Sequence, residues 1–271
     1  MSLTSRTVNM VVQGVGPVSV ALTERGAGRP FLLLHGGPGP QSVSTFADLL
    51  AETAHVRVIA PTHPGFGLTP RPEGLATVRG LAALYVALID ELDLADVIVV
   101  GNSMGGWIAA EMALQRCDRI GGIVLVGAVG IEVPELPVAD FFSLTLEQVV
   151  KRSYHDPSAF RLDPSAMSAE QRAIMAGNRS ALAVYGGTPP MVDLTLRDRL
   201  QAVTCPSLVV WGESDRVVHP DYGRAYAAAI PAAGFELLEA TGHVPQIETP
   251  ERLLGAIQKF ANDDGAGRSA L

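Results

Sequence analysis

Short apolar runs alternate with amphipathic stretches over most of the chain. Eight runs have the length of strands, and they cover residues 7–12, 18–24, 31–34, 56–60, 97–100, 123–126, 207–211 and 235–238. Helical spacing of apolar residues is clearest over residues 78–92, 105–115, 222–229 and 250–261. The first two strands are expected to form an antiparallel edge. The regular alternation that follows them predicts an α/β fold with a doubly wound, mostly parallel sheet.

One segment breaks this alternation. Between about residue 132 and residue 200 we predict no buried strand, and amphipathic helical pieces take its place. The chain therefore divides into a main domain, formed by residues 1–131 and 201–271, and an inserted helical segment, residues 132–200.

A glycine-flanked serine stands between a predicted strand and a predicted helix. The sequence Gly-Asn-Ser-Met-Gly at residues 101–105 follows the apolar run 97–100 and leads into the helix at 105–115. A turn this tight strains the backbone of Ser103, and glycine on either side lets the strand and the helix approach closely. The turn pushes the hydroxyl out above the sheet edge, which makes Ser103 a candidate nucleophile.

A serine nucleophile needs a base and an acid, and candidates for both follow predicted strands. Asp215 lies in the loop after the strand at 207–211, and His243 lies in the loop after the strand at 235–238. The carboxyl ends of parallel strands form the functional edge of an open α/β sheet, so these loops are expected to meet. We expect His243 to take the serine proton while Asp215 holds the histidine, with Glu213 as the alternative acid.

Four motifs together resemble the α/β-hydrolase fold superfamily over about residues 5–262. They are His-Gly-Gly-Pro-Gly at 35–39, Pro-Gly-Phe-Gly at 64–67, the serine turn at 101–105, and the acid and histidine loops in the order serine, aspartate, histidine. The resemblance implies a mostly parallel eight-stranded sheet with helices on both faces. It also implies that residues 132–200 form a short helical cap inserted after the sixth strand.

The resemblance further implies an oxyanion hole made of backbone N–H groups. One donor is Met104, which follows the nucleophile, and the second is Gly37, with Gly36 as the alternative. His35 is expected to brace this loop by packing rather than to take part in catalysis. His63 stands where many relatives carry an acid before the Pro-Gly-Phe-Gly motif.

The cap is expected to line an acyl or alkyl pocket as well as to pack on the main domain. The candidate substrate contacts are Phe141, Phe142, Met175, Arg179 and Val244. Arg179, Asn178 and His155 are the polar candidates for recognising a head group, although exposed surface is the simpler expectation for each.

Composition and charge narrow the possible partners. The 271 residues are 48% apolar, which suits a large core, and the net charge of −8 argues against nucleic acid or an anionic membrane. Two cysteines cannot make a disulfide framework, and no signal segment or membrane span is predicted, so we expect a cytoplasmic protein. The histidines lack metal-ligand spacing and no nucleotide fingerprint is present, so neither a metal nor a cofactor is expected. The oligomeric state is left open.

The fold and triad that the resemblance implies serve several reactions, so the reaction is chosen on particular residues. A serine nucleophile differs from the aspartate of haloalkane dehalogenases and epoxide hydrolases. We predict hydrolysis of a small, largely apolar carboxylic ester or lactone through an acyl-enzyme. The first alternative is carbon–carbon hydrolysis of the meta-cleavage-product type, whose members resemble residues 102–106 but usually carry an aromatic residue in place of Val244. The second alternative is a hydrolase-fold protein that binds a ligand without turnover.

Overall fold

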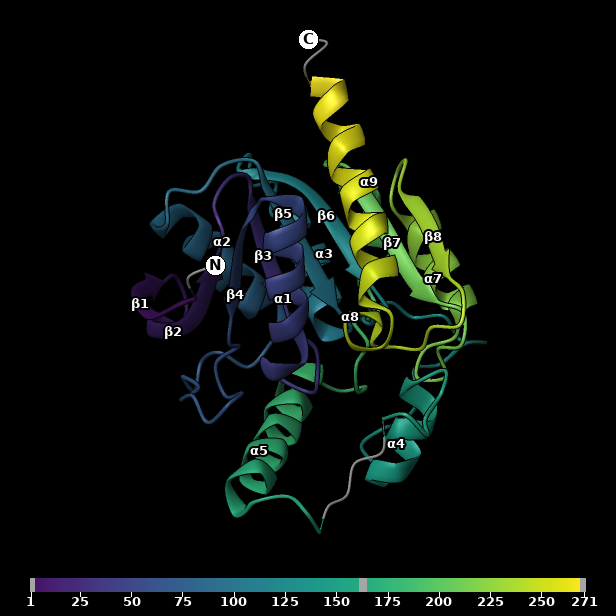
Figure 1. Cartoon of the computed structure of the whole chain (residues 1–271). Coiled ribbons are helices and arrows are strands. Elements are labelled where there is room, and N and C mark those ends of the chain that lie inside the picture. Colours follow the sequence, from purple (N-terminus) through teal and green to yellow (C-terminus); the bar gives the residue numbers. More distant parts are fainter. Residues whose placement is uncertain (1–2, 161–164, 269–271) are drawn as a thin grey trace.

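A single eight-stranded sheet forms the centre of the molecule. The computed structural model describes residues 3–160 and 165–268. The strands are β1 (Thr4–Val12), β2 (Gly16–Arg25), β3 (Pro30–Leu34), β4 (Arg57–Pro61), β5 (Val97–Asn102), β6 (Ile120–Val126), β7 (Ser207–Gly212) and β8 (Gly234–Leu238). Their spatial order is β1-β2-β4-β3-β5-β6-β7-β8, with antiparallel pairing of β1 with β2 and of β2 with β4 (Figure 1). The other neighbours are parallel, which confirms the predicted fold class.

Helices cover both faces of this sheet. They are α1 (Gln41–Ala54), α2 (Val78–Glu91), α3 (Met104–Leu114), α4 (Leu146–Ser153), α5 (Ala169–Gly186), α6 (Leu196–Arg199), the 3-10 helix η1 (Leu200–Ala202), α7 (Pro220–Ala229), α8 (Pro245–Glu248) and α9 (Pro250–Arg268). The apolar side chains of α1 and α9 join one buried cluster, and those of α2, α3 and α7 join another (Figure 1). Alternate residues of β5 enter the two clusters, Val99 with α3 and Val100 with α1, so the strand is buried throughout.

Helix α1 is not predicted from the sequence because its N-terminus lacks the residues that usually begin a helix. Its first turn has no acidic residue, and Pro40 at its N-cap makes no side-chain hydrogen bond. Tertiary packing stabilises it instead, since Val43, Phe46 and Leu50 are buried against the sheet. Helix α9 begins where expected and continues to Arg268, beyond the predicted end at residue 261.

Helices α4 and α5 lie beyond the carboxyl ends of the strands (Figure 1). Both belong to the segment between β6 and β7, and both begin with a capping box, at Thr145 and at Ser168. The shorter α6 lies against α3, where the Arg199 guanidinium pairs with both oxygens of the buried Glu111 at 2.6 and 2.9 Å. Residues 161–164 of the predicted cap lie outside the described residues, and the cap boundaries at 132 and 200 stay a prediction.

Among residues 3–160 and 165–268, no helix combines the length and the apolar composition needed to cross a bilayer.

Strand β5 and helix α3 meet with almost no space between their backbones. A Cβ atom on Gly105 would lie 2.3 Å from the carbonyl oxygen of Leu34 in β3, and one on Gly101 would lie 2.1 Å from the carbonyl oxygen of Gly105. Both obstacles are backbone atoms, one in α3 and one in the central strand β3, and neither can move aside as a flexible side chain could. Glycine is therefore required at both positions for the turn that carries Ser103.

We expect Gly105→Ala to lower the free energy of unfolding by about 3 kcal/mol or more, because the added methyl overlaps the Leu34 carbonyl. The matched control is Gly255→Ala in α9, where nothing lies within 4 Å of the added Cβ. Alanine is the better helix former there, so this control is expected to gain about 0.5–1 kcal/mol. Denaturant unfolding of the three proteins measures both changes, and a Gly105→Ala protein as stable as the parent would contradict this account.

Candidate active site

Ser103 lies at the junction of β5 and α3 in a strained conformation. Its backbone angles, φ 55° and ψ −116°, fall outside the regions that residues with side chains ordinarily occupy. Its N–H donates to the carbonyl of Val126 at 2.8 Å, and its carbonyl accepts the N–H groups of Gly106 at 3.0 Å and Trp107 at 3.2 Å. The strand on one side and the helix on the other thus hold the serine in this conformation. The predicted acid and base follow β7 and β8, whose carboxyl ends lie at the same edge of the sheet as that of β5.

Asp215 and His243 form a buried hydrogen-bonded pair. The Nδ1 atom of His243 lies 2.7 Å from Oδ2 of Asp215, and the residues are 7% and 3% exposed. The second carboxylate oxygen of Asp215 accepts the backbone N–H groups of Val217 and Val218, both at 2.9 Å. Because a carboxylate only accepts, the imidazole donates its Nδ1–H and presents Nε2 as a proton acceptor. The arrangement suits a general base.

Glu213, the alternative acid, faces a different part of the chain. Its side chain is exposed and accepts the backbone N–H of Ala240 at 3.2 Å. It therefore caps the chain near the end of β8, whereas the carboxylate that holds His243 belongs to Asp215.

Asn102 cross-links the serine turn to the histidine loop, a role that its position in the motif did not reveal. Its Nδ2 donates to the carbonyl oxygens of His243 at 3.0 Å and Val126 at 3.2 Å. Its Oδ1 accepts the side-chain N–H of Gln246 at 3.2 Å. With the amide committed to three partners, the loop that carries His243 is fixed directly beside the turn that carries Ser103.

The oxyanion loop, residues 35–39, is a tight turn that follows β3. The N–H of Gly39 donates to the carbonyl of Gly36 at 3.1 Å, which places Gly37 and Pro38 at the two corners. The left-handed φ of 94° at Gly39 completes the turn at a conformation that glycine adopts without strain.

This turn lies against the serine. A Cβ atom on Gly36 would come within 3.0 Å of the Ser103 Cβ, so the absence of a side chain allows the contact. In the described part of the chain, the N–H groups of Gly37 and Met104 donate to no other group of the protein. Their role as oxyanion donors stays a prediction, and both N–H groups are free to fill it.

Two buried histidines hold the oxyanion loop from the core side. His35 donates its Nδ1–H to the Gly36 carbonyl at 2.8 Å, and its Nε2 accepts the backbone N–H of His63 at 3.1 Å. His63 in turn donates its Nε2–H to the His35 carbonyl at 2.8 Å. The Nδ1 atom of His63 accepts a hydrogen bond from the Tyr85 hydroxyl, which lies 2.5 Å away. Each imidazole thus has one donor and one acceptor nitrogen in use, which defines two neutral tautomers.

Burial keeps both of these histidines uncharged. Burial lowers the pKa of His35 to about 4, against an ordinary value of 6.5. Burial, and next the neighbouring His35, lowers the pKa of His63 well below its ordinary value. Both residues have 0% exposure, so a proton on either ring would be a charge without solvent around it. This accounts for a histidine at position 63: it acts as a neutral hydrogen-bonding group.

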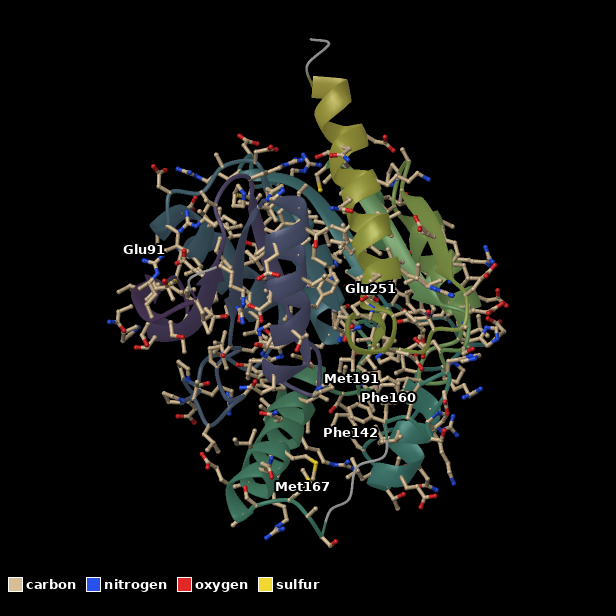
Figure 2. The ribbon with its side chains drawn as sticks, in the orientation of Figure 1. Glu91, Phe142, Phe160, Met167, Met191 and Glu251 are labelled. Atoms are coloured by element: carbon tan, nitrogen blue, oxygen red, sulfur yellow. The ribbon has the colours of Figure 1, made fainter. Side chains whose placement is uncertain are left out.

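Apolar side chains from the inserted segment cover the oxyanion loop. A Cβ atom on Gly37 would lie 2.8 Å from Cδ2 of Leu182 in α5 and 3.8 Å from Cζ of Phe141. Phe141 stacks on Phe142 with ring centroids 4.6 Å apart, and Phe142 lies between α4 and α5 (Figure 2). Leu182 belongs to the apolar residues of the predicted cap, but it is not one of the five candidate substrate contacts. The signal for it was its place on the buried row of α5, one turn after Asn178.

The other predicted substrate contacts differ in how exposed they are. Val244 is buried directly after His243, whereas Met175 is 38% exposed on α5. Arg179 lies on the exposed side of α5, where its guanidinium donates to the carbonyls of Phe141, at 3.4 Å, and of Phe142. Direct contact of these side chains with a substrate stays a prediction.

The other two polar head-group candidates are both engaged within the protein. The expectation of an exposed surface is wrong for Asn178, which is 4% exposed and bonded to two core loops. His155 is exposed, with its Nδ1 2.7 Å from the Ser214 hydroxyl. Its backbone N–H donates to Glu248 at 2.7 Å, and the other oxygen of that carboxylate accepts the N–H of Gly242 at 2.6 Å. Glu248 thereby ties the end of α4 to the histidine loop.

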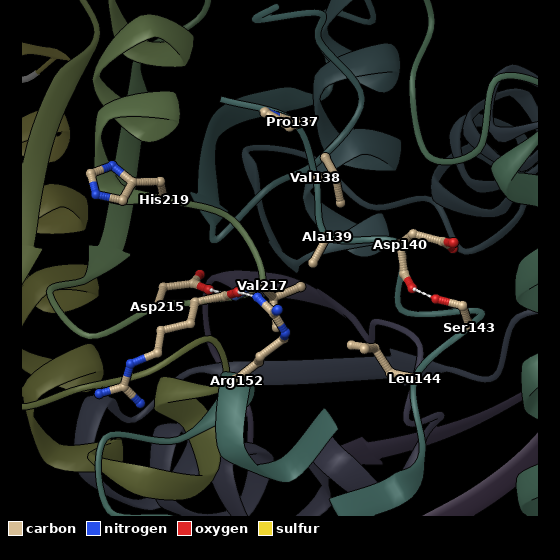
Figure 3. A pocket seen from close by; sticks show the side chains of 11 residues that line it. Pro137, Val138, Ala139, Asp140, Ser143, Leu144, Arg152, Asp215, Val217 and His219 are labelled. Carbon is tan, nitrogen blue, oxygen red and sulfur yellow. Dashed lines mark hydrogen bonds between the residues drawn. The ribbon is translucent and has the colours of Figure 1, made fainter. Parts of the chain in front are cut away.

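A cavity of about 830 Å³ opens beside the acid loop (Figure 3). Its walls come from residues 137–140, 143 and 144, from Arg152 at the end of α4, and from residues 215–217 and 219, so the predicted contacts Phe141 and Phe142 do not line it. Of the proposed triad, Asp215 alone lines it.

No group of three His, Cys, Asp or Glu side chains that could hold a metal ion is found within residues 3–160 and 165–268.

Comparisons with known proteins agree with this fold. A sequence profile described as the alpha/beta hydrolase family matches residues 31–256. The chain is 39% identical over 265 residues to a 2-hydroxy-6-oxo-2,4-heptadienoate hydrolase from Pseudomonas putida, covering 90% of this chain and 93% of that protein. A thermophilic esterase from Thermogutta terrifontis superposes with a TM-score of 0.76 at 26% identity, covering 96% and 99% of the two chains. A meta-cleavage product hydrolase from Pseudomonas fluorescens IP01, at 21% identity, 94% and 97% coverage and a TM-score of 0.75, shares the fold.

The buried histidines predict a loss of stability in mild acid. Each is neutral in the folded protein but binds a proton near pH 6.5 when unfolded, so stability is complete above that pH and falls below it. Together they are expected to remove about 2–3 kcal/mol between pH 7.5 and pH 5.5. Denaturant unfolding at the two pH values measures the loss. His63→Asn should lower stability at pH 7.5 but halve this part of the pH dependence, and an unchanged dependence would contradict the assignment.

Proposed function

The chain belongs to the alpha/beta hydrolase family, and from that premise we propose that it hydrolyses a small, largely apolar carboxylic ester or lactone through an acyl-enzyme on Ser103. The observation that carries the proposal is the 2.7 Å hydrogen bond between His243 and the buried Asp215, tied through Asn102 to the strained serine turn. The partner is a small-molecule acyl compound, and the chemistry draws on side chains and backbone groups of this chain alone.

In the proposed mechanism the Ser103 oxygen attacks the substrate carbonyl while Nε2 of His243 takes its proton. Asp215 keeps the Nδ1–H of that histidine oriented and stabilises the imidazolium as it forms. The backbone N–H groups of Gly37 and Met104 receive the oxyanion. His243 then returns the proton to the leaving alcohol, and a water activated by the same nitrogen releases the acid and restores the serine.

The surroundings of the loop favour an uncharged acyl group. Leu182 and Phe141 lie over Gly37, whereas the neighbouring cation, Arg179, lies on the exposed side of α5, where its Nη2 donates to the carbonyls of Phe141 and Phe142. A carboxylate placed under these apolar side chains would lose hydration without gaining a charged partner there, which is costly. An ester or lactone with an apolar acyl chain carries no such penalty.

Carbon–carbon hydrolysis is the second candidate, and the sequence comparison favours it. The relative with 39% identity is named as a heptadienoate hydrolase, and the match extends over nine-tenths of this chain. The same serine, histidine and oxyanion donors would serve, and the bond broken would join the carbonyl carbon to carbon instead of oxygen. A ligand-binding protein without turnover is the third candidate and predicts no reaction in either assay.

We expect the protein to hydrolyse p-nitrophenyl esters in a series from acetate to decanoate, and Ser103→Ala to lose at least about a thousandfold in rate. The chain length with the highest kcat/KM measures the depth of the pocket. Ser180→Ala is the matched control because that hydroxyl is exposed on α5 and bonds only to the Ala176 carbonyl of its own helix. Failure of the parent protein across the series, with turnover of a 2-hydroxy-6-oxodienoate, would replace the ester by the carbon–carbon reaction.

Asp215→Asn is expected to lower kcat by about ten-thousandfold, because the amide can present a donor to Nδ1 and favour the wrong tautomer of His243. Glu213→Gln, two residues away and exposed, is expected to stay within about twofold of the parent, as a surface change should. Steady-state kinetics on the preferred ester separate the two variants. Equal losses in both would show that the loop, and not the Asp215 carboxylate, is what catalysis requires.

A further inference from the structure

Asn178 of helix α5 forms a buried polar bridge to two loops of the main domain. Its Nδ2 donates to the carbonyl of Pro38 at 2.9 Å, and its Oδ1 accepts the N–H of Gly67 at 2.8 Å. The residue is 4% exposed, so neither bond competes with bulk water. Both ends of one side-chain amide are therefore committed, and each joins the inserted segment to a motif of the core.

The oxyanion loop is shaped to receive this amide. A Cβ atom on Gly39 would lie 2.3 Å from Nδ2 of Asn178, so any other residue there would displace the side chain. Gly65 is similarly close to α5, with a Cβ atom there 3.2 Å from that of Ala181. The glycines of two separate motifs thus open the space into which α5 packs.

A hydrogen bond to the Pro38 carbonyl can fix the conformation of the oxyanion loop. Pro38 and Gly37 are the two corners of the turn from Gly36 to Gly39, so fixing the Pro38 carbonyl restricts rotation of the whole turn. On the core side the turn is held by His35, whose Nδ1–H donates to Gly36. Asn178 is the holding group on the opposite side. A displaced N–H at Gly37 would weaken oxyanion stabilisation more than substrate binding, because that bond forms mainly in the transition state.

We propose that Asn178 is a positioning residue for the oxyanion hole, through which the docking of α5 sets the orientation of the Gly37 N–H. The inference rests on the proposed function for its catalytic consequence. It deepens that function by making the inserted segment part of the catalytic geometry, since the same helix contributes Leu182 above Gly37.

Tyr185 supplies a matched control on the same helix. Its hydroxyl donates to the carbonyl of Pro64 at 2.8 Å, which also joins α5 to the core but does not touch the turn at residues 36–39. Tyr185→Phe removes one buried bond and keeps the ring. Asn178→Ala removes both bonds of the bridge. Asn178→Asp keeps an acceptor for Gly67 but brings no donor to Pro38.

The experiment compares the parent, Asn178→Ala, Asn178→Asp and Tyr185→Phe by three measurements. These are kcat and KM on the preferred ester, affinity for an alkyl boronic acid that forms a tetrahedral adduct with the serine, and amide hydrogen exchange of the peptide covering residues 35–41. Both Asn178 variants are expected to lose about tenfold to a hundredfold in kcat and in boronic acid affinity, with KM within about threefold. Their exchange at residues 35–41 should accelerate, whereas Tyr185→Phe should match the parent in all three.

Two outcomes would overturn the proposal. One is unchanged kcat and unchanged exchange in Asn178→Asp, which would show that the bond to Pro38 is dispensable. The other is an equal loss in Tyr185→Phe at an equal fall in Tm, which would reduce the effect to general docking of α5. If the parent protein hydrolyses no ester, the proposed function is wrong, and this result does not bear on the role of Asn178. Exchange at residues 35–41 then still decides whether Asn178 holds the turn.

Discussion

The contact between the backbones of β5 and α3 is the constraint on which the rest of the site depends. At Gly101 and Gly105 there is no room for a single methyl group, and between them Ser103 adopts a backbone conformation that costs free energy. The sheet stabilises this arrangement because β5 is buried on both faces and its neighbours supply the hydrogen bonds of the turn. Rigidity at the centre of the molecule thus fixes the direction of the serine side chain.

Around that centre, hydrogen bonds between uncharged groups hold the loops, in a space where burying a charged pair would cost more free energy. His35 and His63 contribute four ring nitrogens, and each is used once, as donor or acceptor, in a space without exposed surface. Neutral groups bear less desolvation cost than ions do, so they can be packed behind the oxyanion loop without a solvent channel. The acid Asp215 is the exception, and it is offset by two backbone N–H groups and an imidazole.

The sequence predicted what depends on local pattern, and it missed what depends on contacts between distant segments. Strands β3 to β7 follow from continuous apolar runs, because a strand buried on both faces reads as a continuous apolar segment, and β1 and β2 largely alternate between buried and exposed positions. The Ser103, Asp215 and His243 loops follow from the turn residues that bound these runs. Helix α1 was missed because packing, not capping, sustains it. The bridge by Asn178 was missed because its two partners, Pro38 and Gly67, lie more than 100 residues away, at separations of 140 and 111.

The hydrogen bond from Asn102 to the His243 carbonyl joins residues 141 apart in the chain. During synthesis, a chain that has emerged only as far as β6 already contains the residues of the serine turn, yet the proposed acid and base are still to be made. Closing so long a loop comes late in folding, because its entropy cost must be met by contacts from β7 and β8. Under the proposed mechanism, chemical competence is therefore confined to the finished molecule, and a nascent or truncated chain would carry an inert serine.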